Sequence, residues 1–152
     1  MHYRIRFLSA KPIRQAFARR TLLQNPGAEA QLKAFAEQKS SEWIVVAVDY
    51  DSNDQRFSGR AMQLLNSANI GTMANTTYLE TKDGKRNFVK QYMAPIKDGM
   101  GAKFVFPRVV DGQPFIKEDS GYVRFYSEIF GDLKLNMRFE VPDMMYEGAL
   151  EY

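Results

Sequence analysis

Residues 133–141, with the sequence LKLNMRFEV, decide the fold of this chain. Apolar residues occupy the odd-numbered positions of this stretch, and polar or charged residues occupy every even-numbered position. Because successive side chains of a strand point to opposite faces, the pattern predicts a β-strand with one buried face and one solvated face. Residues 122–129 alternate in the same way. The two segments together predict an antiparallel hairpin.

The charges on the solvated faces indicate how the two strands pair. Both apolar sets carry odd numbers, so the numbers of two paired residues must add up to an even value. A sum of 262 places Arg124 opposite Arg138, whereas a sum of 264 places Arg124 opposite Glu140 and Tyr126 opposite Arg138. Opposite charges across a strand pair are stabilising, and like charges are destabilising. We therefore predict the register with a sum of 264, although it needs the longer turn.

Other segments between residue 43 and the end of the chain also favour extended structure. The β-branched run at residues 44–48 is typical of a strand that is covered on both faces. Asp-Gly pairs at residues 83–84, 98–99 and 111–112 supply the positive φ that tight hairpins need. Between these pairs, the pattern predicts extended segments at residues 77–81, 86–92, 102–109 and 113–117.

The N-terminal part of the chain is predicted to be helical. Pro12 suits the first turn of a helix whose apolar residues run to the break at residues 25–27, and residues 28–36 repeat the helical spacing. We therefore expect helices within residues 11–39 and a β-rich part over residues 43–152. The predicted fold class is α+β, with two N-terminal helices packed on an antiparallel β-sheet or β-sandwich. No linker or repeat divides the sequence, so residues 1–152 are predicted to form a single globular domain.

The chain has one histidine, His2, and no cysteine. Thiolate zinc sites, iron–sulfur clusters, disulfides and thiol nucleophiles are therefore excluded. Asp49, Asp51 and Asp54 have the spacing of a calcium loop, but Asp54 stands where an EF-hand needs glycine and Arg60 where it needs glutamate. We predict no metal site and no cofactor, and a looser calcium site at the three aspartates stays open.

The net charge is +3, and basic residues gather near the start of the chain. A nucleic-acid-binding module would need these arginines on one surface: Arg4, Arg6, Arg14, Arg19 and Arg20. Steps of 100° per residue scatter the last three around a helix, so nucleic acid is not the expected partner. The longest apolar run, residues 43–48, is far shorter than the roughly 20 residues of a membrane span. Both a cytoplasmic location and export with a removed signal peptide remain open.

The solvated face of the predicted hairpin is the candidate ligand-binding site. It carries Tyr122, Arg124, Tyr126 and Arg138. Tyrosine and arginine side chains on a rigid sheet are able to stack on sugars or bases and to bind carboxylates or phosphates.

The predicted function is a non-catalytic binding or assembly domain that contacts protein or glycan through this sheet face. No catalytic residue is predicted. Two alternatives stay open. A carboxylate-dependent hydrolase would need a pocket in which several acids converge with perturbed ionisation. A nucleic-acid-binding module would use the basic N-terminal segment.

Overall fold

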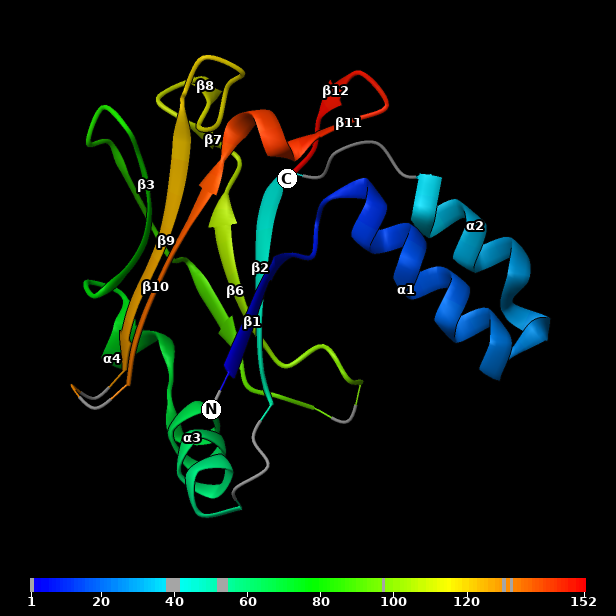
Figure 1. Cartoon of the computed structure of the whole chain (residues 1–152), viewed down its shortest axis with the longest axis horizontal. Helices are drawn as coiled ribbons and strands as arrows, with labels where there is room; N and C mark the ends of the chain where they lie inside the picture. Colours follow the sequence, from blue (N-terminus) through cyan, green and yellow to red (C-terminus); the bar gives the residue numbers. More distant parts are fainter. Residues whose placement is uncertain (1, 38–41, 52–54, 97, 130, 132) are drawn as a thin grey trace.

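The computed structural model describes residues 2–37, 42–51, 55–96, 98–129, 131 and 133–152. Eight strands form two four-stranded antiparallel sheets, which face each other as a sandwich (Figure 1). The first sheet has the order β1 (His2–Phe7), β2 (Trp43–Asp51), β6 (Ala102–Pro107) and β5 (Gln91–Met93). The second has the order β10 (Leu133–Glu140), β9 (Tyr122–Ile129), β3 (Thr77–Thr81) and β4 (Arg86–Phe88).

The remaining elements lie around the sandwich. Two small ribbons, β7 (Val109–Val110) with β8 (Gln113–Pro114) and β11 (Met145–Tyr146) with β12 (Ala149–Leu150), lie at one end of it (Figure 1). The helices are α1 (Lys11–Gln24), α2 (Glu29–Glu37), α3 (Gln55–Ser67) and α4 (Ile70–Met73), with short 3-10 turns at Pro26–Ala28 and Val141–Met144. The α+β class predicted from the sequence is therefore confirmed, with two N-terminal helices and antiparallel sheets. Among the described residues, no helix combines the length and hydropathy that a membrane span requires.

Aromatic rings hold the two sheets together. Phe104 and Phe106 of β6 meet Phe125 of β9, with ring centroids 5.2 and 6.3 Å apart in edge-to-face arrangements. All three side chains are fully buried. Edge-to-face ring pairs stabilise a core beyond the burial of their area. The inward faces of both sheets thus form one core.

Residues 86–92, predicted as one extended segment, form two strands in different sheets. The Val89 amide donates to the Thr77 carbonyl of the second sheet, and the next amide, that of Lys90, donates to the Val105 carbonyl of the first. The chain therefore passes from one sheet to the other between these two residues. The alternation of buried and exposed residues is regular from Asn87 to Lys90 and breaks at Gln91, which is exposed like Lys90, as the chain bends into the other sheet.

The opposite side of the sandwich is bounded by the edge strands β1 and β10. The rings of Phe7 and Phe139 meet there at 4.8 Å. The alternation at residues 133–141 predicts a fully buried apolar face, and Leu133 and Leu135 are buried as expected. Met137, however, is 40% exposed. It lies on the core face of β10, beyond which no further strand continues the sheet among the described residues.

Helices α1 and α2 pack against each other beside the β1–β2 side of the sandwich (Figure 1). The acidic C-terminal segment connects them to the rest of the molecule. The Lys11 ammonium lies 3.1 Å from the Glu147 carboxylate, and the Tyr146 hydroxyl donates to the Gln15 side chain at 2.8 Å. The basic start and the acidic end of the chain therefore neutralise each other in part.

Tyr92 gives the sandwich a measurable dependence on alkaline pH. Its hydroxyl donates to the Leu65 carbonyl, and burial raises the pKa of Tyr92 from its ordinary value of 10.0 to about 12. The folded state thus keeps a proton that the unfolded chain releases. The stabilisation is complete below about pH 10 and is lost as the pH rises towards about 12. We expect the unfolding free energy of the wild type to fall more steeply over this interval than that of Tyr92→Phe, measured by urea denaturation. Parallel curves would contradict the assignment.

Candidate functional site

The four residues predicted as a ligand-binding site project from one face of the second sheet. Tyr122, Arg124 and Tyr126 alternate along β9 with fully buried neighbours, and Arg138 lies on the adjacent strand β10. Their face points away from the core. Helices α1 and α2 lie beyond the other sheet, and α3 lies at the lower end of the sandwich (Figure 1). The four side chains are therefore accessible from solvent.

The structure corrects the predicted register of this hairpin. Ile129 pairs with Leu133 and Arg124 pairs with Arg138, which corresponds to the sum of 262 and not 264. This register lets the ladder start closer to the turn. Each arginine has a carboxylate partner of its own, since Arg124 lies 4.0 Å from Glu80 of β3 and Arg138 lies 2.5 Å from Glu140 of its own strand. The prediction was wrong because it considered only charges directly opposite each other on the two strands of the hairpin.

Strands β3 and β4 extend the site with residues that were not predicted from the sequence. Tyr78 stacks on Tyr126 with ring centroids 5.2 Å apart, and the Phe88 ring lies 5.6 Å from Tyr78. The Arg86 guanidinium lies over the Tyr78 ring at 4.3 Å and binds Glu80 at 2.7 Å. We call the whole surface the outer face, and it comprises Tyr78, Arg86, Phe88, Tyr122, Arg124, Tyr126 and Arg138.

The alternation at residues 77–81 could have predicted that Tyr78 belongs to this face. Thr77, Leu79 and Thr81 are buried, so Tyr78 and Glu80 must point outward. The pattern does not indicate that β3 pairs with β9, because the two strands are separated by more than 40 residues in the sequence.

Cation–π contacts and hydrogen bonds order the outer face. The guanidinium of Arg138 lies 4.8 Å from the centre of the Tyr122 ring, and that of Arg124 lies 6.0 Å from it. The hydrogen bond from the Tyr126 hydroxyl to Glu128, at 3.1 Å, raises the pKa of that tyrosine, with burial and the Glu128 charge adding to the effect. The hydrogen bond to Glu80 raises the pKa of Arg86. The face is therefore a layer of rings and cations that contact one another.

A polar groove adjoins the outer face at Arg86. Its volume is about 910 Å³, and it runs between the β3–β4 turn and the β7–β8 ribbon. Charged side chains of both signs line it: Lys82, Lys85, Arg86, Lys117, Asp83, Asp111 and Asp119. The hydrogen bond from the Thr81 hydroxyl lowers the pKa of Asp83, so this carboxyl stays ionised. The general acid of a hydrolase needs the reverse, a carboxyl kept protonated near neutral pH.

The N-terminal arginines do not form the single surface that a nucleic-acid-binding module would need. Arg14 is buried, at 7% exposure. Arg4 and Arg6 lie on β1 beside Asp49, at 3.1 and 4.0 Å from its carboxylate. Arg19 and Arg20 lie on α1. These five residues are therefore divided between an exposed strand face, an exposed helix face and the interior.

The candidate calcium loop lies mostly outside the part of the chain that the structure places. Asp54 is outside the described residues, and Asp51 is described only as the last residue of β2. Asp49 is bound by the two arginines of β1. Among the described residues, no group of three or more His, Cys, Asp or Glu side chains is placed to hold a metal ion.

Comparisons with protein-family models, with curated proteins and with solved structures find no match for this chain. Function is therefore inferred from the geometry alone.

Proposed function

We propose that this chain is a non-catalytic binding domain that docks a protein partner through the outer face. The observation that supports this is the assembly of tyrosine, phenylalanine and arginine side chains on one uncovered sheet. Tyr122 and Arg138 illustrate it, because each is partly exposed and each contacts the other. Aromatic residues and arginine are enriched at the energetic centres of protein–protein interfaces.

The order of the outer face favours binding. Arg86 is held by both Glu80 and the Tyr78 ring, and Arg138 is held by both Glu140 and the Tyr122 ring. Side chains that are ordered before association lose less conformational entropy when a partner arrives. A carboxylate or backbone carbonyl of the partner would accept hydrogen bonds from the remaining guanidinium N–H groups.

A protein partner suits this face better than a glycan. Sugar binding by aromatic residues requires a ring surface that is free for stacking. Tyr78 contacts both Tyr126 and Arg86, and the Tyr122 ring lies beneath Arg138. These contacts occupy ring faces that a sugar would need, whereas a protein interface uses ring edges and guanidinium groups as well.

The alternative as a carboxylate-dependent hydrolase has less support. Asp83 and Asp98 are the carboxyls among the described residues whose pKa values clearly depart from the ordinary value, and both are lowered. Burial alone would raise the pKa of Asp98, but the hydrogen bonds from Lys103 and the Met100 amide, together with the Lys103 charge, outweigh it. Neither carboxyl is suited to act as a general acid.

The experiment is a quantitative affinity capture that compares Arg138→Ala with Arg4→Ala. Both arginines lie on strands and are paired with a carboxylate, and their side chains are 55% and 57% exposed. The two substitutions therefore remove the same charge at sites of equal exposure, but Arg4 lies on the other sheet. We expect a protein partner that the wild type and Arg4→Ala retain and that Arg138→Ala loses. Identical capture by all three would contradict the proposal, as would a glycan array that shows binding sensitive to Arg138.

A further inference from the structure

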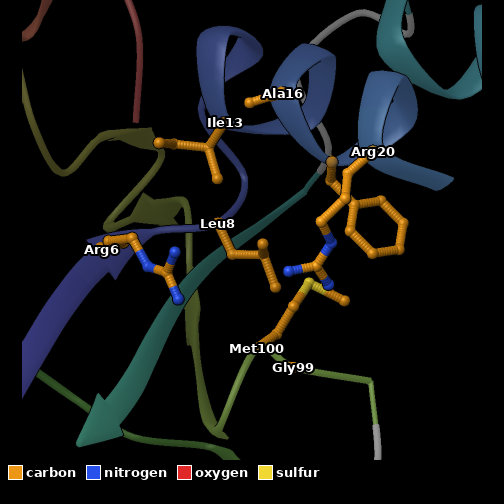
Figure 2. Close-up of a pocket in the computed structure, with 8 residues that line it drawn as sticks. Arg6, Leu8, Ile13, Ala16, Arg20, Gly99 and Met100 are labelled. Atoms are coloured by element: carbon orange, nitrogen blue, oxygen red, sulfur yellow. The ribbon is translucent and has the colours of Figure 1, made fainter. Parts of the chain in front are cut away.

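A second candidate site lies away from the outer face, between α1 and the first sheet. A cavity of about 160 Å³ lies there, and Figure 2 shows the residues that line it. The end of β1 and the following residue supply Arg6 and Leu8, and the β5–β6 connection supplies Gly99 and Met100. Helix α1 supplies the other lining residues: Ile13, Ala16, Phe17 and Arg20. Three separate segments of the chain thus meet around one cavity.

The lining combines an apolar floor with two cations. Leu8, Ile13 and Met100 are each only partly buried, so apolar surface remains in contact with water. The guanidinium groups of Arg6 and Arg20 lie on opposite sides of Leu8, and Met100 lies beside that of Arg20 (Figure 2). None of the described residues that line the cavity is acidic.

The carboxylates that neighbour these two arginines are engaged elsewhere. Asp49 is closer to Arg4, at 3.1 Å, than to Arg6, at 4.0 Å. The Asp98 side chain is bound by the Lys103 ammonium at 2.6 Å and by the Met100 amide at 2.9 Å. Arg20 donates to the backbone carbonyl of Asp98, at 2.8 Å, and not to its carboxylate. Both guanidiniums keep N–H donors for an additional anion.

The backbone of the β5–β6 connection leaves room for the Arg20 side chain at Gly99. Gly99 has a φ of +73°, and a Cβ atom there would lie 2.9 Å from Nη2 of Arg20. The arginine therefore lies directly over a residue without a side chain. Its guanidinium also lies 5.9 Å from the centre of the Phe17 ring. These contacts hold a cation at the rim of an apolar cavity.

We propose that this cavity binds a small organic acid, namely a carboxylate attached to an aromatic or branched apolar group. A cavity of about 150 Å³ accommodates benzene, so the apolar group has the size of one ring. The carboxylate accepts hydrogen bonds from Arg6 and Arg20, a pairing whose planar geometry suits guanidinium donors. The ring occupies the space between Leu8, Ile13 and Met100.

The test uses phenylacetate as the probe, with benzyl alcohol as a neutral analogue, and follows binding by NMR titration of the full chain. We expect phenylacetate to shift the methyl signals of Leu8, Ile13, Ala16 and Met100, and benzyl alcohol to bind at least about tenfold more weakly. Equal affinity for the two compounds would overturn the proposal. So would the absence of any saturable shift up to about 10 mM phenylacetate.

Two matched variants test the roles of the charge and of the cavity. Arg20→Gln should weaken phenylacetate binding about tenfold, whereas Arg19→Gln, which removes the same charge from an exposed neighbour outside the lining, should leave it within about twofold. Ala16→Phe fills the cavity from an exposed helix position and should abolish binding. The amide spectrum of each variant reports whether it is folded. The proposed site would be contradicted if the Arg19 and Arg20 substitutions weakened phenylacetate binding equally. It would also be contradicted if Ala16→Phe bound phenylacetate as the wild type does.

Discussion

Phe125→Ala is expected to lower the unfolding free energy by about 3–5 kcal/mol, the usual cost of truncating a fully buried phenylalanine. Phe125 is the ring through which β9 contacts both Phe104 and Phe106 of the opposite sheet. Its removal leaves a cavity between the two layers and breaks two edge-to-face contacts. Urea denaturation of the purified variant measures the loss.

Phe139→Ala is the control for the same change at the margin of the core. Phe139 is only partly buried and contacts one ring, that of Phe7. Water is able to fill part of the space that the smaller side chain leaves, so the loss should be less than half of that at Phe125. Equal losses at both positions would show that the β1–β10 margin is as tightly packed as the centre of the sandwich.

Gly101→Ala is the second substitution for which we expect a large effect, a loss of about 3 kcal/mol or more. Gly101 has a φ of +83°, which alone costs another residue roughly 1–2 kcal/mol. An added Cβ would also lie 2.2 Å from the Val48 carbonyl oxygen, in the middle of the first sheet. Backbone atoms of a central strand cannot yield as a side chain does, so the β2–β6 pairing must shift. Thermal and urea denaturation report the change.

Gly112→Ala separates the contact from the backbone strain. Gly112 has a comparable φ of +74°, but no atom lies within 4 Å of the position of an added Cβ. This variant should therefore lose only the roughly 1–2 kcal/mol that the left-handed conformation costs. If Gly101→Ala were no more destabilising than Gly112→Ala, the close approach to Val48 would not matter for stability.

Local patterns were sufficient to predict most of the strands. The segments at residues 77–81 and 122–129 agree with β3 and β9 at both ends, and the alternation at residues 133–141 gives β10 to within one residue. These strands each have one buried and one solvated face, and the alternation of apolar and polar residues in the sequence predicts such a strand. The two N-terminal helices follow from periodicity and from the Asn25-Pro26-Gly27 break in the same way.

The extended segment predicted at residues 113–117 is a strand only at Gln113–Pro114. Three other failed predictions depend on strands that are distant in the sequence. The register was wrong because Glu80, which compensates Arg124, comes from β3. The corner at Val89 and Lys90 depends on which sheets lie on either side of it. Met137, which is 40% exposed, lies on β10, an edge strand among the described residues. In each case the missing information is the order of the strands, which residue alternation does not encode.

In the candidate sites, too, residues that are close in the sequence were predicted, and residues that only the fold brings together were not. Four residues of the outer face were predicted because they lie on one hairpin, whereas Tyr78, Arg86 and Phe88 come from the neighbouring pair of strands. The cavity beside α1 was not predicted at all. Its lining joins Leu8, Arg20 and Met100, and only the packing of α1 beside the first sheet brings them together.

The most direct test of the outer face is the dissociation constant of the captured partner, measured by calorimetry for the wild type, Arg138→Ala and Arg4→Ala. Arg138 and Arg4 are exposed, so each substitution should change the unfolding free energy by no more than about 0.5 kcal/mol. Arg138→Ala should nevertheless weaken binding about fivefold or more, because an arginine at the centre of an interface contributes more than about 1 kcal/mol. Arg4→Ala should bind as the wild type does. Equal dissociation constants for all three proteins would show that the outer face is an ordinary solvated surface.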